Sequence, residues 1–365
     1  MILMNDFKAE PEALRVAELA AVERVLHSGW YVLGNEVRAF EAAWAERCGV
    51  AHATGVGNGM DAIEIGLRAL DIGPGDEVIT TPMTAFATVL AILRAGASPV
   101  LADIDARTAL LDPASVERCI TARTRAVLLV HLYGQVREME QWVALCDRHG
   151  IALLEDCAQS HLAQWNERAG GSFGRFGAYS FYPTKNLGAL GDGGALVSDD
   201  PALAQRAAVL RNYGQNVRYH HPELGLNSRL DELQAALLLA RLEWLEGFTQ
   251  RRLRIAAEYR VGIRNSALQL MAAPIQINSH VYHLFVVLCE QRDRLAQHLK
   301  ERGVETLVHY PVPIHNQPPC RNMGRDPHGL GVAERHAAQC LSVPCHPQMS
   351  NADVAHVVEA INAFS

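Results

Sequence analysis

Short apolar runs alternate with helix-like stretches between residues 50 and 200. The runs near residues 77–81, 99–104, 126–131, 151–155, 177–181 and 194–198 are typical of buried strands. Asp112 with Pro113 and Asp200 with Pro201 are pairs that favour the start of a helix. Strands that alternate with helices indicate an α/β fold, in which a mostly parallel sheet has helices on both faces.

The pattern changes on either side of this region. Residues 9–27 and 36–47 read as two helices, and residues 230–260 read as one long helical region. After about residue 250 a strand over 281–288 and a helix over 292–302 predict a smaller α+β unit. We therefore expect a large domain at 1–250 and a small C-terminal domain at 251–365. The segment 318–331, rich in Pro, Gly and Arg, is expected to be a mobile loop.

Composition excludes several classes of protein. The 365 residues are 49% hydrophobic, which is enough for a large core, and the net charge of −7 carries no basic stripe for nucleic acid. No apolar segment is long enough to cross a membrane and no signal peptide is visible, so we expect a cytoplasmic protein. The eight cysteines form no Cys-x-x-Cys pair and the sixteen histidines no His-Glu-x-x-His, so we expect no metal site.

One lysine stands in an unusual setting. Lys185 lies between the apolar run Tyr179–Tyr182 and a stretch with four glycines within ten residues. A surface lysine on a flexible loop is one interpretation. Packing does not require an ammonium there, whereas a desolvated lysine loses basicity and becomes an amine nucleophile. That is the property needed for a Schiff base with pyridoxal phosphate.

A carboxylate follows a predicted strand about thirty residues earlier. Asp156 ends the apolar run that begins at Ile151, and ligands of open α/β sheets bind at the carboxyl ends of strands. Pyridoxal phosphate needs a carboxylate at its pyridine nitrogen. An Asp that only caps a helix is the alternative. Paired with Lys185, Asp156 favours the cofactor role, and Gln159 could reach the ring hydroxyl.

A third motif favours phosphate binding. Residues 54–62, Thr-Gly-Val-Gly-Asn-Gly-Met-Asp-Ala, join a short strand to an amphipathic helix, with Asn58 as a plausible N-cap and Asp61 three residues on. Small residues let the backbone approach an anion at the helix N-terminus. An ordinary strand–turn–helix is the alternative, and neither the dinucleotide fingerprint nor the P-loop string is present.

Together these blocks resemble the DegT/StrS-type nucleotide-sugar aminotransferases. The resemblance runs almost end to end, and its most specific parts are Ser180-Phe-Tyr-Pro-Thr-Lys185 and Gly225-Leu-Asn-Ser-Arg-Leu-Asp231. It implies a type I pyridoxal-phosphate aminotransferase fold and a homodimer whose active sites lie at the subunit interface. By resemblance, Lys185 would hold the cofactor as an imine and act as the catalytic base. The implied cofactor-binding residues are Gly59, Met60, Asp156, Gln159, Ser180, Lys185, Asn227 from the second subunit, and Phe86.

Two features bear on the substrate. Many members carry a ring-stacking aromatic residue directly after the Thr of a Pro-x-Thr block, but here Ala85 holds that place and Phe86 follows it. The lysine block is most similar to 3-aminotransferases of dTDP-3-keto-6-deoxyhexoses, with L-glutamate as the expected donor. UDP-linked 3-ketosugars, 4-ketosugars and a non-catalytic cofactor-binding regulator remain alternatives. Candidate substrate-binding residues are Tyr31, Tyr182, Tyr219, His220, Arg229, His309, Tyr310 and His315.

Overall fold

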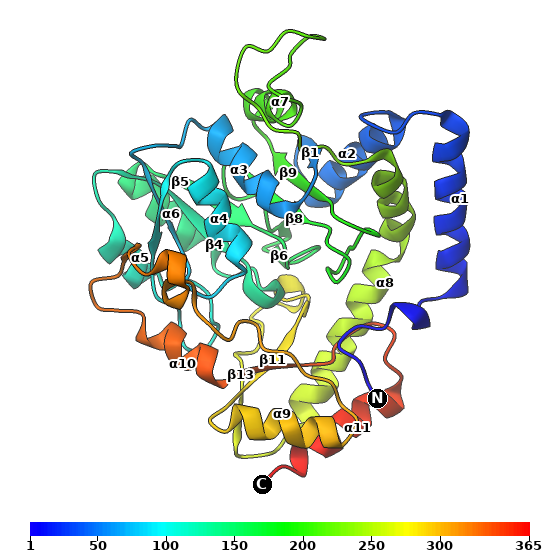
Figure 1. Cartoon of the computed structure of the whole chain (residues 1–365). Helices are drawn as coiled ribbons and strands as arrows, with labels where there is room; N and C mark the ends of the chain where they lie inside the picture. Colours follow the sequence, from blue (N-terminus) through cyan, green and yellow to red (C-terminus); the bar gives the residue numbers. More distant parts are fainter.

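An eight-stranded sheet forms the centre of the larger part of the molecule (Figure 1). The computed structural model describes all residues from Met1 to Ser365. The strand order is β1-β9-β8-β5-β4-β2-β3-β12, and only β9 runs antiparallel to both of its neighbours. The mostly parallel sheet is thus confirmed. The strands are β1 (His52–Val56), β2 (Glu77–Thr80), β3 (Ser98–Leu101), β4 (Thr124–Val130), β5 (Ala152–Asp156), β8 (Gly177–Ser180), β9 (Gly194–Ser198) and β12 (Gly324–Arg325).

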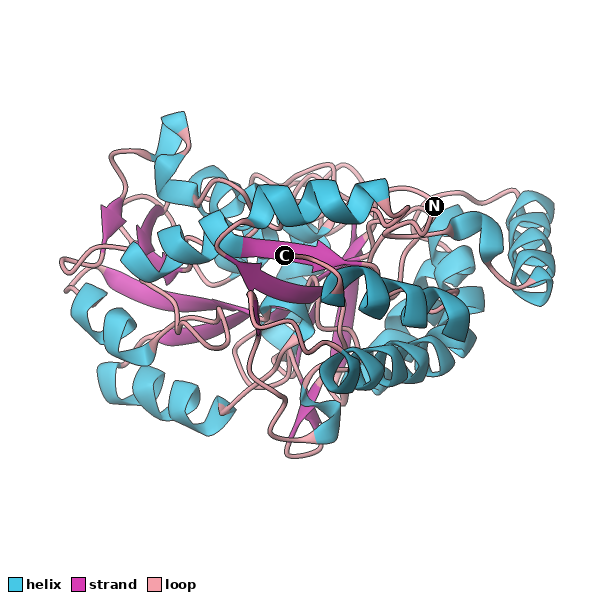
Figure 2. Ribbon diagram, turned by 90° about the horizontal axis from the view of Figure 1, so that it is seen from below, coloured by secondary structure: helices cyan, strands magenta, loops and turns pink.

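Helices cover both faces of this sheet, as Figure 2 shows from below. They are α3 (Gly59–Ala69), α4 (Phe86–Arg94), α5 (Pro113–Cys119), α6 (Met139–His149) and α7 (Pro201–Leu210). One core joins α3, α4 and α7 to the sheet, and a second core joins α5 and α6 to it. The side chains of Asp112 and Asp200 cap α5 and α7, each followed by a proline, as predicted.

A long helix connects the two parts of the chain (Figure 1). α8 (Glu232–Gly262) packs its first half against α1 (Glu12–Ser28) and α2 (Asn35–Cys48). Its second half places Ile255 and Tyr259 in a separate C-terminal core. The predicted boundary at residue 250 falls inside this unbroken helix, so the division of the chain into two domains there stays a prediction.

The C-terminal part is built around a three-stranded antiparallel sheet in the order β10-β11-β13. Its strands are β10 (Leu268–Leu270), β11 (Phe285–Cys289) and β13 (Cys340–Val343), and its helices are α9 (Arg292–Glu301), α10 (Gly331–Gln339) and α11 (Asn351–Asn362). The strand predicted from residue 281 begins only at Phe285. The carbonyls of residues 281–283 are bound instead by the side chains of Asn186 and Arg252, which replace strand partners.

The segment 318–331 is not the free loop that its composition predicts. Its residues Gly324 and Arg325 form β12 and pair with β3 at the edge of the main sheet. Asp326 is buried, where it accepts hydrogen bonds from Ser115 and Arg118. A buried carboxylate with this many donors anchors the segment, which corrects the expected mobility. Separately, no helix of the chain is long and apolar enough to span a bilayer.

Two helical glycines give a test of the packing around α3. A Cβ on Gly66 would lie 2.5 Å from ring atoms of the buried Phe176, whereas Gly247 in α8 has open space around it. We expect Gly66→Ala to destabilise the protein by roughly 1–3 kcal/mol through overpacking. Gly247→Ala is the matched control and should stabilise it by about 0.5–1 kcal/mol, the helix preference of Ala. Urea unfolding measures both; effects of the same sign would contradict this packing.

Candidate active site

The predicted functional residues gather at one edge of the main sheet. Asp156 is the last residue of β5, Ser180 is the last residue of β8, and these two strands are parallel. His131 directly follows β4, the other neighbour of β5. Because parallel strands end at the same edge, the loop that carries Lys185 starts beside Asp156. This places the predicted site at the carboxyl ends of the central strands.

Lys185 lies in a tight turn between β8 and β9. Its backbone N–H donates to the carbonyl of Tyr182 at 2.8 Å. Burial of the amine lowers the pKa of Lys185 to about 8, and the negative charge of Asp156 opposes this shift. A substantial fraction of the Lys185 amine is therefore neutral near physiological pH, which is the form that acts as a nucleophile or base.

Asp156 is buried and held by two protein donors. Thr88 Oγ1 donates to Asp156 Oδ2 at 2.8 Å, and the Ala158 backbone N–H donates to Oδ1 at 3.1 Å. Burial raises the pKa of Asp156 above its usual value, and these hydrogen bonds and the positive charge of Lys185 offset only part of the shift. The carboxylate can thus hold a charge in a place where an unpaired one would be costly.

The orientation of the Gln159 side-chain amide is fixed by two hydrogen bonds. The backbone N–H of Tyr133 donates to Gln159 Oε1 at 2.6 Å, and Gln159 Nε2 donates to the Tyr310 hydroxyl at 3.2 Å. Since a backbone N–H can only donate, Oε1 must face Tyr133, and Nε2 has a second proton to offer. Such a donor suits a phenolic oxygen on a ligand, the partner predicted for Gln159.

The strand–helix junction from Gly57 to Asp61 has the features of an anion cradle. Asn58 caps α3 by accepting the N–H of Asp61 at 2.9 Å, as predicted. The amides of Gly59 and Met60, in the first turn, have no acceptor in the protein. A Cβ on Gly59 would come within 2.7 Å of Ser180 Cβ, so only glycine lets the cradle approach Ser180.

The C-terminal part brings two predicted substrate residues toward Lys185. Burial and the Lys185 charge lower the pKa of His309 to about 4, and its Nδ1 lies 2.8 Å from Ser342 Oγ. Tyr310 contacts Gln159 through its hydroxyl, and burial raises its pKa to about 12. His315 is buried elsewhere and bonds Glu334 of α10.

Other predicted residues face solvent in the single chain. Tyr219 and His220 lie on a loop that projects beyond α7 (Figure 1), and Tyr219 is 76% exposed. Arg229 bonds the side chain of Asn212, and Asn227 is exposed beside the same residue. Three further residues, Tyr31, Tyr182 and Phe86, are exposed apolar rings. The roles of all these residues stay predictions.

Sequence reasoning missed several residues that hold the site together. Thr88 binds Asp156, and Ser228 Oγ accepts the Gly57 N–H and donates to Asp61. Asn186 joins Val281 and His283 to the lysine loop. Thr88, Asn186 and Ser228 all stand inside or next to blocks that the sequence marks out, so their polar side chains were the available signal.

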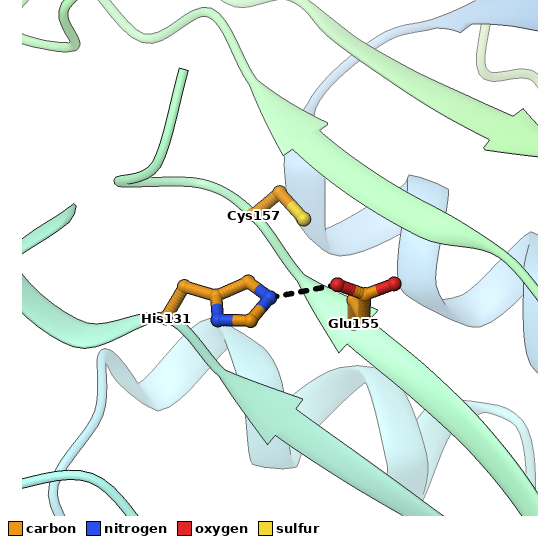
Figure 3. Close-up of side chains that lie close together, drawn as sticks. All are labelled: His131, Glu155 and Cys157. Atoms are coloured by element: carbon orange, nitrogen blue, oxygen red, sulfur yellow. Dashed lines mark hydrogen bonds and ion pairs between the residues drawn. The ribbon is translucent and has the colours of Figure 1, made fainter. Parts of the chain in front are cut away.

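Figure 3 shows a buried group of His131, Glu155 and Cys157, of which Glu155 and Cys157 flank Asp156 in the sequence. His131 Nε2 is 2.8 Å from Glu155 Oε2, and that carboxylate also accepts the backbone N–H groups of Gly171, Phe173 and Gly174. Burial raises the pKa of the Cys157 thiol well above its usual value. Glu155 thus accepts hydrogen bonds from four donors, and Cys157 is a protonated thiol. This group therefore serves to anchor the loop of residues 171–174.

The site combines a partly neutral lysine amine with a buried carboxylate and an anion cradle at the N-terminus of a helix, all at one edge of the sheet. This combination is typical of an aminotransferase-type α/β enzyme. The match to a family model places the chain more closely: residues 12–362 match the DegT/DnrJ/EryC1/StrS aminotransferase family. The chain belongs to this family, which confirms the resemblance read from its motifs.

The similar proteins cover nearly the whole chain. It is 45% identical to dTDP-3-amino-3,4,6-trideoxy-alpha-D-glucose transaminase of Streptomyces venezuelae, over 99% of this chain and 95% of that one. It is 41% identical to a pleiotropic regulatory protein of Geobacillus stearothermophilus, over 99% and 98%. The crystal structure of S. venezuelae DesV in complex with a ketimine intermediate superposes with a TM-score of 0.95 at 45% identity, over 99% and 97%.

The lowered pKa of Lys185 can be measured directly, because the sequence holds only three lysines, Lys8, Lys185 and Lys300. In the chain stripped of bound aldehydes and labelled with ¹³C-lysine, we expect the Cε signal of Lys185 to titrate near pH 8. The signals of the other two lysines serve as the comparison. Lys185→Arg identifies the signal.

The same shift makes stability depend on pH. Unfolding takes up a proton at Lys185 between about pH 8 and 10.4, so this group makes the folded state more stable as pH rises through that window. A Lys185 signal that moves together with those of Lys8 and Lys300 would show that the amine is not desolvated.

Proposed function

We propose that this chain is a pyridoxal-phosphate-dependent aminotransferase that moves an amino group from L-glutamate to the 3-keto carbon of a dTDP-3-keto-6-deoxyhexose. The observation that carries the proposal is the pairing of Lys185 with buried Asp156 beside the Gly59 cradle. The sugar follows from similarity to a dTDP-sugar 3-transaminase at 45% identity over nearly the full length of both chains.

The residues fit the cofactor at four of its groups. The free amides of Gly59 and Met60 at the start of α3 suit a phosphate. Asp156 offers a carboxylate with both oxygens oriented, which suits a protonated pyridine nitrogen. Gln159 Nε2 offers an N–H to the ring hydroxyl, and the Lys185 amine offers the nucleophile. Pyridoxal phosphate, when bound here, supplies an electron sink for the bonds at the donor carbon.

The chain's own groups then account for proton transfer. Burial keeps part of the Lys185 amine unprotonated, so its Nζ can take the proton from the α-carbon of the amino donor. The same Nζ, once protonated, lies in the field of Asp156 and can return the proton to the neighbouring carbon. His309 is held neutral by burial, so it can donate or accept a hydrogen bond without repelling Lys185.

A second copy of the chain would complete the site. Asn227, Tyr219 and His220 are exposed in the segment that follows α7, where they could meet the phosphate and sugar bound by a partner. A homodimer with shared active sites is therefore part of the proposal. Deletion of the loop that carries Tyr219 and His220 would then remove activity at the active site of the partner subunit as well as at that of the same subunit.

A binding-only regulator is the second candidate, because a relative at 41% identity is described as a pleiotropic regulatory protein. A regulator could use the cradle and the carboxylate. It would not need a lysine with a lowered pKa, so the pKa of Lys185 favours the enzyme.

The test is amination of defined ketosugars. The purified protein with pyridoxal phosphate and glutamate should convert dTDP-3-keto-6-deoxyglucose into a 3-amino sugar, identified by mass spectrometry and NMR. Lys185→Ala should fold and lose at least about 10³-fold in rate, since the nucleophile and base are gone. Lys300→Ala, at an exposed position of α9 outside the site, is the matched control and should retain turnover.

Other acceptors separate the alternatives. Faster amination of a UDP-linked 3-ketosugar would move the substrate assignment to that class, and amination of a 4-ketosugar would change the position. No amination of any ketosugar by a protein that binds the cofactor would favour the regulator.

A further inference from the structure

The segment around Ala85 carries two hydroxyls that form a hydrogen-bonded chain to Asp156. Thr84 precedes Ala85, and Thr88 lies in the first turn of α4. Both side chains are almost fully buried. Thr84 Oγ1 lies 2.7 Å from Thr88 Oγ1, and Thr88 Oγ1 lies 2.8 Å from Asp156 Oδ2. The segment thus contacts the carboxylate that is proposed to meet the cofactor.

The direction of these hydrogen bonds follows from proton counting. An ionised carboxylate only accepts, so the single proton of Thr88 goes to Asp156 Oδ2. Thr88 then has no proton left for its neighbour, and Thr84 must donate to Thr88 Oγ1. The result is a chain of two donors that ends on the carboxylate. Each hydrogen bond in such a chain polarises the next one and strengthens it.

This chain fixes the orientation of Asp156. Oδ2 accepts from Thr88, and Oδ1 accepts from the Ala158 N–H, so each oxygen has one donor on the protein side. A proton on Oδ2 would collide with the Thr88 donor. The start of α4 adds a favourable dipole for an anion. These donors favour the charged form of the carboxylate and leave its remaining lone pairs free for one more donor.

We propose that Thr88, supported by Thr84, is a positioning residue that holds the Asp156 carboxylate for a cationic ring N–H. The inference rests on the proposed use of pyridoxal phosphate. It gives a function to the two hydroxyls of the segment around Ala85. Thr88 acts through Asp156 and not on the reacting atoms.

The experiment compares two ligands that differ only at the ring nitrogen. Pyridoxal phosphate and its 1-deaza analogue carry the same aldehyde, hydroxyl and phosphate, so only the contact to Asp156 differs. Their affinities for the apo protein are measured by absorbance titration in wild type, Thr88→Val, Thr88→Ser and Thr84→Val. We expect Thr88→Val to weaken pyridoxal phosphate binding roughly tenfold, since it removes a charge-assisted hydrogen bond. Binding of the deaza analogue should change less than about twofold.

Three further comparisons make the result specific. Thr88→Ser keeps the hydroxyl and should restore the preference for the nitrogen-containing ring. In an Asp156→Asn background Thr88→Val should have no further effect on that preference, because the residue acts through the carboxylate. Thr84→Val leaves Thr88 in place and should cause a smaller loss. It tests the chain of donors if Thr88→Val fails to fold.

Equal losses for both ligands would overturn the proposal, because they would show that Thr88 only supports the fold. Failure of Thr88→Ser to restore the preference would also overturn it. A wild-type protein that binds neither ligand would refute the proposed cofactor, and the role of Thr88 with it. That outcome differs from a failure of Thr88 alone, in which wild type prefers pyridoxal phosphate and Thr88→Val prefers it equally.

Discussion

The attraction between a buried carboxylate and a poorly solvated amine is the constraint around which this molecule is organised. Asp156 and Lys185 influence each other's charge, and neither could stay charged at this depth without help. The fold supplies that help from several directions. Thr88 and Ala158 donate to Asp156, and the loop of Lys185 is fixed by its turn and by Asn186. Reactivity at Lys185 is thus a property of the surroundings.

The C-terminal part contributes as much to the site as the sheet does. Arg252 and Asn186 bind the backbone at residues 281–283, so β11 begins only at Phe285 and this segment is drawn to the lysine loop. Tyr310 reaches Gln159, and Tyr133 donates to the His309 carbonyl at 2.6 Å. Because these contacts join the two parts of the chain across the site, movement of one part would alter the donors offered by the other.

The sequence predicted the parts of the site that depend on local pattern. Apolar runs placed β5 and β8, and their ends placed Asp156 and Ser180. The cap at Asn58 followed from its spacing to Asp61. Contacts between distant segments were not predictable in this way. The bond from Thr88 to Asp156 spans 68 residues, and the contact of Asp326 with Ser115 turned an expected loop into an edge strand. Such pairs depend on tertiary packing, which no periodicity records.

The most direct test of the central claim is the visible absorbance of the wild-type protein with pyridoxal phosphate before and after addition of L-glutamate. The account predicts a band of the lysine-bound cofactor that glutamate converts to the pyridoxamine form, and that Lys185→Ala never shows. A band that no amino donor alters, or no band at all, would contradict the claim that Lys185 and Asp156 form a working aminotransferase site.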